Sequence, residues 1–176
     1  TDQASNNSDL QCYQGFIALT NNQERTLVVY EGSHLLHQDY FKEKNINNSK
    51  NWNIICPKYL ENIKENKKIL SIPAGSLVLW DSRVFHQNQY GKPNSEERLV
   101  QYVCYLPKNN PKNNLSMQSK RQNYFINKRT TSHWPYPIKV NSLQPQTYGD
   151  KSKIINYELM PNDDLSSLQQ EIEKLL

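Results

Sequence analysis

The chain of 176 residues and 20.7 kDa is long enough for one domain with a buried core, and its aromatic residues supply the large side chains that such a core needs. Its formal net charge of +4 comes from basic residues scattered among acidic ones, and no apolar run is long enough for a bilayer, so we expect neither a nucleic-acid partner nor a membrane span. Three cysteines without a C-x-x-C pair argue against a disulfide framework and favour a reducing, cytoplasmic location.

The first part of the chain is predicted to be mainly β, because short runs of β-branched and aromatic residues alternate with Gly, Asn, Pro and Ser clusters. Two strands are predicted at 12–20 and 26–33. The stretch 39–68 is predicted to be an insertion with one short helix near 57–63, where apolar residues have loose helical spacing. Further strands follow, two around a Pro-Ala-Gly-Ser turn and one after it, at 69–89 and 98–107.

The remainder of the chain is predicted to wrap around that core. The polar stretch 108–123 is expected to be a surface loop or helix, and the proline-rich stretch 129–149 is expected to be extended chain. Apolar residues at helical spacing behind Asp163 or Asp164 predict an amphipathic helix at 163–176. We therefore expect a single domain over 1–176, with core strands over about 9–107 and a C-terminal wrap and helix over 108–176.

His86 and Arg98 are the most informative pair of residues. His86 is predicted at the end of an apolar strand, and Arg98, 12 positions later, at the start of its hairpin partner. Both side chains would then lie on one inner wall of a small barrel, because antiparallel neighbours stand opposite one another. Imidazole is a good iron(II) ligand, and a guanidinium group can hold a carboxylate with two parallel hydrogen bonds. The alternative from these two residues alone is a surface histidine on a turn and an arginine in an exposed ion pair.

Four segments form an ordered pattern from about residue 2 to 149. They are Gln14–Leu19, Leu27–His34, the stretch from Gly75 to His86 with Arg98 leading residues 100–105, and His133-Trp134-Pro135. The pattern resembles the phytanoyl-CoA dioxygenase family of iron(II)- and 2-oxoglutarate-dependent oxygenases. The second segment is similar to the family's P-G-[ST]-H stretch, with Glu31 where the proline is usual.

The resemblance implies a fold and an activity. The fold would be a distorted double-stranded β-helix, the jelly-roll barrel of cupin-like oxygenases, incomplete at its N-terminus and with a C-terminal helix. The family binds iron(II) through His-x-Asp/Glu and a second, distant histidine. Asp2 and His86, 84 positions apart, match the last two of these ligands. Arg98 would hold 2-oxoglutarate, which with dioxygen would serve the hydroxylation of a small-molecule or lipid-type substrate.

The first histidine of that metal motif should stand immediately before Thr1, outside this sequence. We therefore expect the chain by itself to bind iron weakly and to have little or no activity. A literal His-x-Asp occurs as His37-Gln38-Asp39, 47 positions before His86, and is an alternative metal motif in what the resemblance makes a surface loop. His34 is interpreted as a structural turn histidine, because Gly32-Ser33 before it is typical of a tight turn.

Other side chains are candidates for the rest of the site. Gln14 and Asn88 are placed to reach 2-oxoglutarate or an iron-bound water, or else are buried amides bonded to the backbone. Arg83 is predicted either to pin its loop or to meet an anionic substrate. His133 and Trp134 are predicted to close the mouth of the pocket, with core packing as the alternative for the tryptophan.

Two rival interpretations remain open. In the first, the chain is a catalytically inactive double-stranded β-helix that acts as a binding module. In the second, it is a general interaction module with fortuitous motif matches. The sequence indicates neither the substrate nor the oligomeric state.

Overall fold

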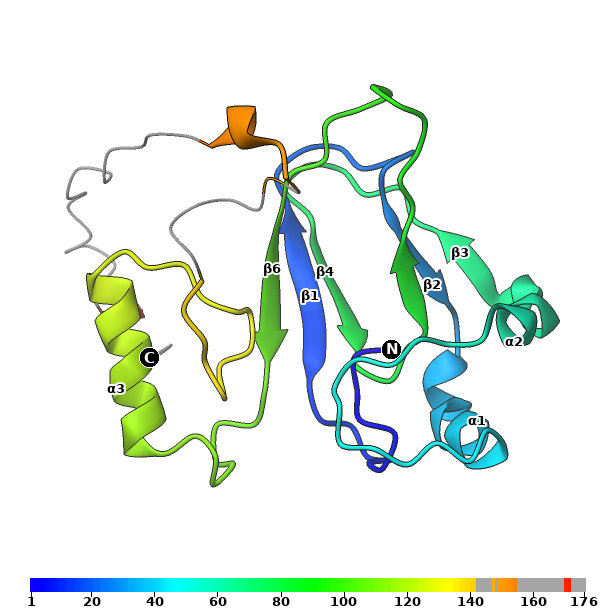
Figure 1. The fold of residues 1–176 in the computed structure, drawn as a ribbon, viewed down its shortest axis with the longest axis horizontal. Helices are drawn as coiled ribbons and strands as arrows, with labels where there is room; N and C mark the ends of the chain where they lie inside the picture. The colour runs from blue at the N-terminus through cyan, green and yellow to red at the C-terminus, as the bar shows by residue number, and fades with distance from the viewer. Residues whose placement is uncertain (142–146, 148, 155–169, 172–176) are drawn as a thin grey trace. The chain divides into compact units, whose positions relative to one another are not determined.

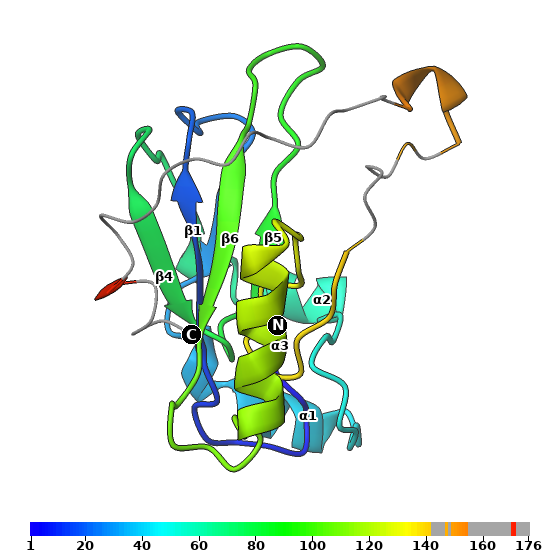
Figure 2. The same cartoon turned by 90° about the vertical axis from the view of Figure 1, so that its left-hand side faces the viewer.

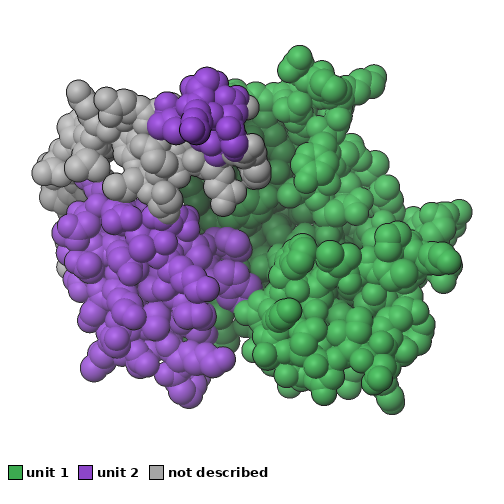
Figure 3. Space-filling view, in the orientation of Figure 1, with its two compact units in different colours: residues 1–107 green, residues 108–176 purple. Residues whose placement is uncertain are grey.

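The computed structural model describes residues 1–141, 147, 149–154 and 170–171. The chain falls into two units, Thr1–Pro107 and Lys108–Leu176, which Figure 3 shows in green and purple. The first unit holds the two sheets and most of the candidate residues. The prediction of one domain over 1–176 stays a prediction.

The first sheet has three antiparallel strands in the order β4–β1–β6 (Figure 1). Their bounds are Leu77–Asp81 for β4, Tyr13–Ala18 for β1 and Val100–Tyr105 for β6. On the central strand, Gln14 lies opposite Trp80 on one side and Cys104 on the other. Because strand side chains alternate between faces, Gln14 and Phe16 point to the same face of this sheet.

The second sheet is also antiparallel and has the order β3–β2–β5. Its strands are β2 (Leu27–Tyr30), β3 (Lys67–Ile69) and β5 (His86–Asn88). Val29 on the central strand pairs with His86, and Leu27 pairs with Asn88. The chain passes from one sheet to the other between β1 and β2, between β3 and β4, and twice more around β5 (Figures 1 and 2).

The two sheets face each other across an apolar core. Its buried members are Phe16 and Ala18 of the first sheet, Leu27 of the second sheet, and Ile72 in the chain between β3 and β4. Trp80 and Tyr102 pack against this cluster, and each meets the Phe16 ring edge to face at 5.9 Å between ring centroids. Burial of these aromatic groups contributes to the hydrophobic stabilisation between the sheets.

Two short helices cover the other face of the second sheet. α1 (His37–Glu43) buries Tyr40 and Phe41 against Tyr30 and Phe85, and α2 (Pro57–Asn62) begins with a proline at its first turn. Single 3₁₀ turns, η1 (Ser33–Leu35) and η2 (Lys64–Asn66), precede α1 and follow α2.

The prediction of one helix in 39–68 was therefore incomplete, because α1 overlaps the start of that stretch. The inward face of α1 carries only a histidine and two aromatic residues, all buried, so an apolar periodicity is hard to recognise there. The predicted pair of strands in 69–89 was also too simple, because the chain turns after Asp81 and His86 opens a separate strand in the other sheet.

The second unit contains α3 (Leu115–Ile126), whose N-terminus is capped by the Asn114 side chain accepting the Met117 N–H at 3.1 Å. This helix agrees with the surface loop or helix predicted after Pro107. The described residues from 129 to 141 hold no helix or strand longer than the Thr131–Val140 bridge, as their prolines predict. The η3 turn (Lys151–Lys153) follows. The helix predicted at 163–176 lies outside the described residues, except for 170–171.

The expectation of a mainly β first unit is confirmed in outline, since two antiparallel sheets with peripheral helices form it. Within the described part of the chain these sheets do not close into a barrel. No helix among those residues is both long and apolar enough to cross a membrane.

Candidate functional site

A carboxylate and an imidazole that are 84 positions apart in sequence meet in the first unit. Asp2 Oδ2 lies 3.2 Å from His86 Nε2, and both side chains are largely buried. The chain around Asp2 is held by Ser82, whose carbonyl accepts the Asp2 N–H at 3.3 Å and the Thr1 hydroxyl at 2.8 Å. The Ser82 hydroxyl donates to Gln3 Oε1 at 2.7 Å. These buried bonds fix the N-terminal segment beside the start of β5.

The orientation of His86 leaves one ring nitrogen directed at Asp2. His86 Nδ1 lies 3.0 Å from the Val84 carbonyl oxygen, which can only accept, so Nδ1 carries the proton in this bond. The Trp80 ring packs beside the imidazole, with 5.2 Å between centroids. Metal-binding histidines commonly use such a bond to a backbone carbonyl to fix the ring and its tautomer. Nε2 is therefore the nitrogen that faces Asp2, and a metal held there would replace the proton that Nε2 shares with the carboxylate.

The environment of Asp2 favours the ionised carboxylate. Burial by itself would raise the pKa of Asp2, but hydrogen bonding to His86, the charge of His86 and a hydrogen bond with Gln14 together lower that pKa. Gln14 is buried on the central strand, and its Oε1 has no hydrogen-bond partner among the described residues. A buried amide oxygen without a donor is uncommon and suits a site that an external group completes.

The residues present fit two positions of an iron(II) site. Carboxylate oxygen and imidazole nitrogen are the donors of the facial triad that leaves coordination positions open for oxygen chemistry. Neighbouring ligands of an octahedral ion with bonds of about 2.1 Å lie about 3 Å apart, close to the 3.2 Å between Asp2 and His86. No group of three His, Cys, Asp or Glu side chains suited to a metal occurs within the described residues.

Cys104 does not supply a third ligand of this kind. It lies opposite Gln14 on β6, near Asp2. A hydrogen bond with Cys12 and burial raise the pKa of the Cys104 thiol, so it stays protonated near neutral pH. Among the described residues, Cys104 belongs to no group of three side chains suited to a metal.

Arg98 lies at the other end of the space between the sheets. Its Nε donates to Asn22 Oδ1 at 3.1 Å, and its guanidinium carbon lies 5.3 Å from the centre of the Phe16 ring. Asn22 is fully buried and is held by its own bonds to Thr20 and Ile72. Arg98 Nη2 is buried and has no hydrogen-bond partner in the described part of the chain. The guanidinium is thus fixed and retains an unused donor.

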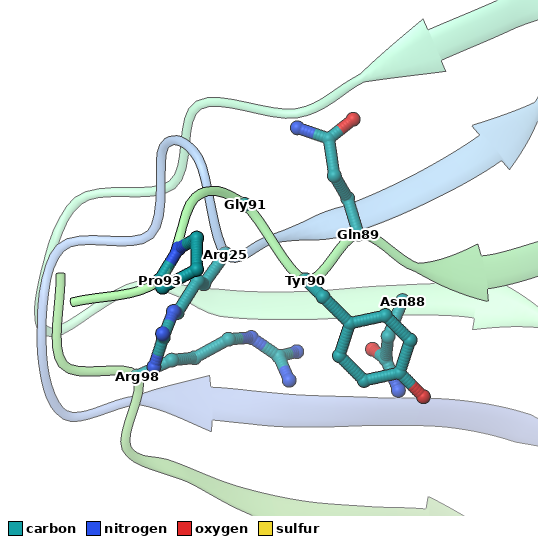
Figure 4. Close-up of a pocket in the computed structure, with 7 residues that line it drawn as sticks. All are labelled: Arg25, Asn88, Gln89, Tyr90, Gly91, Pro93 and Arg98. Carbon is teal, nitrogen blue, oxygen red and sulfur yellow. The ribbon is translucent and has the colours of Figure 1, made fainter. Parts of the chain in front are cut away.

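A cavity of about 500 Å³ opens around Arg98. Asn88 and Tyr90 form part of its wall, and in Figure 4 the Arg98 side chain extends toward these two residues. Asn88 is two positions from His86 on the same face of β5, which corresponds to about 7 Å along a strand. The cavity that holds Arg98 therefore lies one strand repeat away from the Asp2–His86 pair.

The geometry behind the prediction for His86 and Arg98 was wrong, although both side chains do reach the space between the sheets. The two residues are not hairpin partners in one sheet. His86 pairs with Val29 in the second sheet, and Arg98 stands just before β6 of the first sheet. The strand β5 and a long turn separate them in the chain, so His86 belongs to the second sheet and Arg98 lies at the edge of the first sheet.

The other predicted pocket residues have contacts of their own. Arg83 forms a two-pronged ion pair with Asp81, with Nε–Oδ1 3.0 Å and Nη2–Oδ2 2.6 Å, and also donates to the Ser8 carbonyl at 2.8 Å. These contacts correspond to the loop-pinning alternative. His133 and Trp134 belong to the second unit, where their rings lie 6.3 Å apart, and their place at a pocket mouth stays a prediction.

The alternative His37-x-Asp39 motif does not form a joint site. Both residues lie on α1, where positions two apart point to different faces. His37 is buried with its ring 4.8 Å from Phe41, whereas Asp39 is exposed. His34 sits in the η1 turn after Gly32, which has a positive φ of 74°, consistent with a turn histidine.

The burial of His37 predicts a pH-dependent loss of stability. Burial is the main cause that lowers the pKa of His37 from 6.5 to about 4. The unfolded chain therefore binds more protons than the folded chain between these two values, and stability falls as the pH is lowered through that window. We expect His37 to account for about 1–2 kcal/mol of that loss, measured by urea unfolding at pH 7 and pH 4.5.

The matched variants for this measurement are His37→Phe and Tyr40→Phe. His37→Phe should flatten the pH dependence, because the titrating group is gone. Tyr40→Phe removes a 2.8 Å hydrogen bond to the Cys56 N–H from the same helix and should cost similar stability at both pH values. An unchanged pH slope in His37→Phe would contradict the assignment.

Sequence reasoning missed Asn22, Arg25 and Tyr90. Asn22 orients Arg98, and Arg25 and Tyr90 line the same cavity. All three lie in polar turn segments whose composition is that of ordinary solvated loops. They are recognised as site residues only because the fold brings them together around Arg98. No local sequence pattern indicates that contact.

No protein-family model matches this chain, and no curated protein matches it significantly.

Proposed function

We propose that the chain carries the site of an iron(II)- and 2-oxoglutarate-dependent oxygenase that hydroxylates a small-molecule or lipid-type substrate. One observation carries the proposal. A half-buried carboxylate–imidazole pair, Asp2 and His86, lies about one strand repeat from a cavity lined by Arg98, whose guanidinium has no ion-pair partner among the described residues. A keto acid such as 2-oxoglutarate chelates a metal at one end and carries a carboxylate at the other. It therefore requires metal ligands and a guanidinium group at about this spacing.

Each residue has a role in this scheme. Asp2 and His86 would hold iron(II), with His86 coordinating through Nε2 while Nδ1 remains bonded to Val84. Arg98 would bind the distal carboxylate of 2-oxoglutarate. Gln14 Oε1 would accept from a metal-bound water, and Asn88 would donate to the cosubstrate. Bound iron would couple dioxygen and 2-oxoglutarate to the substrate, so that one C–H bond becomes C–OH and succinate and carbon dioxide are released.

The arrangement of the sheets supports the same proposal. Two facing antiparallel sheets, with a chain that repeatedly passes from one to the other, are a feature of jelly-roll barrels. We infer that the first unit is the core of a distorted double-stranded β-helix. The apolar layer around Phe16, Trp80 and Tyr102 would limit water near the metal ligands, as oxidative chemistry requires.

A histidine placed immediately before Thr1 would supply the third protein ligand. Thr1 is buried and bonded to Ser82 and Asn53, so a residue that precedes it is held close to Asp2. A His-x-Asp motif would then supply two ligands from one anchored segment, and His86 the third.

The test is an anaerobic iron(II) titration of two matched proteins, one with a histidine added ahead of Thr1 and the other with an alanine added there. We expect the histidine-bearing protein to bind one iron on the order of 100-fold more tightly than the alanine-bearing protein. His86→Ala in the histidine-bearing protein should lose this affinity, because it removes one of three ligands. Succinate release in air should depend on iron and 2-oxoglutarate. It should be faster for the histidine-bearing protein than for the alanine-bearing protein or for the His86→Ala variant.

If the histidine-bearing and alanine-bearing proteins bind iron equally well, the proposed triad is wrong. Stoichiometric binding of 2-oxoglutarate without any iron or succinate formation would support the rival interpretation, an inactive double-stranded β-helix that acts as a binding module. A matched control is Arg83→Gln, which alters an ion pair with Asp81 outside the proposed triad.

A further inference from the structure

Two arginines without a carboxylate partner line the cavity at the end of the inter-sheet space. Within the described residues, no ion pair involves Arg25 or Arg98. The nearby carboxylate of Glu96 accepts backbone N–H groups from Gln23 at 2.9 Å and Arg25 at 2.5 Å. These bonds hold Glu96 on the main chain of the loop. The cavity therefore carries two positive charges that are not matched by a directly paired anion.

Both guanidinium groups are held in place by the fold. Arg98 is fixed by Asn22 and by the face of Phe16. Arg25 Nη2 donates to the Lys92 carbonyl at 3.4 Å, and its Cγ lies 3.1 Å from where a Cβ on Gly91 would stand. The stem of Arg25 thus packs against a glycine whose φ of +63° suits the tight turn. Little side-chain entropy remains to be lost when either arginine binds a ligand.

Each arginine keeps a buried donor that nothing in the described chain satisfies. These donors are Arg25 Nε and Arg98 Nη2. A buried N–H without an acceptor is costly, and two like charges in one cavity oppose each other. An anion in the cavity offsets the two unpaired charges, although the two buried nitrogens themselves do not open into the cavity. Guanidinium groups bind carboxylates and phosphates through the same paired geometry.

We propose that this cavity is a binding site for a small dianion, a dicarboxylate or a phosphate ester, held jointly by Arg25 and Arg98 and independent of any metal. The two side chains enter from different loops, Arg25 from the β1–β2 connection and Arg98 from the β5–β6 connection. In Figure 4 the Arg98 side chain runs toward Asn88 and Tyr90, whereas the Arg25 side chain lies beside Pro93. They approach the cavity from separate places, so the ligand must reach both of them, either with two carboxylates or with the oxygens of one phosphate.

The site has a consequence for catalysis, and that consequence, unlike the site itself, rests on the proposed function. Because Arg98 would also hold the distal carboxylate of 2-oxoglutarate, a dianion bound to both arginines excludes the cosubstrate. Succinate, the product of the proposed reaction, is itself a dicarboxylate. Binding of succinate at Arg25 and Arg98 would thus slow turnover as product accumulates.

The test is calorimetric titration of the full chain, treated with a chelator, with succinate, inorganic phosphate and neutral succinamide at low ionic strength. We expect succinate or phosphate to bind and succinamide not to bind. Arg25→Gln and Arg98→Gln should each weaken the binding by about tenfold or more, since each removes one charged donor. Arg129→Gln is the matched control, because Arg129 also has a buried Nε without a partner among the described residues but lies in the second unit.

The two anions separate the two sources of the ligand. Tighter binding of succinate supports a dicarboxylate, and tighter binding of phosphate supports a phosphate ester. Wild-type affinity in Arg25→Gln, or equal binding of succinamide and succinate, would overturn the joint site. If melting curves show Arg25→Gln to be unfolded, Arg25→Lys keeps the charge without the planar fork, and unchanged affinity there overturns the site equally.

The iron experiment stands apart from this one. Metal-free dianion binding that requires both arginines, together with no iron binding by the histidine-bearing protein, would support the dianion site and remove the oxygenase proposal. Iron-dependent succinate formation with wild-type kinetics in Arg25→Gln, and no metal-free binding by the parent chain, would remove the dianion site alone.

Discussion

Replacement of Arg98 by alanine is expected to weaken 2-oxoglutarate binding by on the order of 100- to 1,000-fold in the iron-loaded protein that carries a histidine ahead of Thr1. Arg98 is held by Asn22 and Phe16, and its side chain lines the cavity. Removal of the guanidinium would leave the distal carboxylate of the cosubstrate desolvated without a partner, which is more costly than the loss of a neutral hydrogen bond. Anaerobic calorimetry with 2-oxoglutarate measures this loss directly.

Two further variants show whether the effect belongs to the guanidinium fork. Arg98→Lys keeps the positive charge but cannot form two parallel hydrogen bonds, so its affinity should lie between those of the wild type and Arg98→Ala. Asn22→Ala removes only the bond that orients Arg98 and should cause a smaller loss, about tenfold. Arg98→Ala with an affinity within a factor of about three of the wild type would show that the cosubstrate binds elsewhere.

The second large effect is expected at Gly15, in the middle of the central strand β1. A Cβ placed on Gly15 would lie 2.2 Å from the Val78 carbonyl oxygen and 2.5 Å from Leu79 Cδ2. The first contact is with the backbone of β4, which is hydrogen-bonded to β1 and cannot move away without loss of the ladder. Gly15→Ala is therefore expected to lower the free energy of unfolding by about 3 kcal/mol or more, and Gly15→Val to prevent folding.

Thermal unfolding followed by circular dichroism tests this expectation. A loss of about 3 kcal/mol corresponds to a fall in Tm of roughly 10 °C or more for a unit of this size. Gly75→Ala is the control, because a Cβ there meets nothing within 4 Å and its only cost comes from a φ of +83°. That cost is about 1–2 kcal/mol. A Gly15→Ala variant as stable as Gly75→Ala would mean that β1 and β4 separate easily.

Local pattern was sufficient for the elements with clear apolar runs. Tyr13–Ala18, Leu77–Asp81 and Val100–Tyr105 are strands within the predicted ranges, because runs of β-branched and aromatic residues bounded by turn residues favour strands. The helix α1 escaped prediction because its buried face consists of His37, Tyr40 and Phe41, too few residues for a periodicity. The predicted hairpin of His86 and Arg98 failed because a residue's strand can be predicted locally but its sheet cannot.

The candidate site shows the same division. Asp2, His86 and Arg98 were selected by residue type, spacing and resemblance, and the structure brings Asp2 and His86 to 3.2 Å. Arg25 and Asn22 were not selected, because a polar turn residue in a sequence carries no sign of the loop that it will meet. Their roles depend on contacts across more than 70 positions, as in the Asn22–Arg98 bond.

The sequence by itself determined a mainly β first unit with a packed aromatic interior, and which side chains have the chemistry to hold a metal and a carboxylate. Only the tertiary structure decided that His86 on β5 faces the Asp2 carboxylate. It also decided that Arg25 and Arg98, from separate loops, line one cavity. The physical reason is the range of the interactions. Alternation, turn preference and side-chain chemistry act within a few residues, whereas sheet membership and buried charge pairing depend on the whole folded unit.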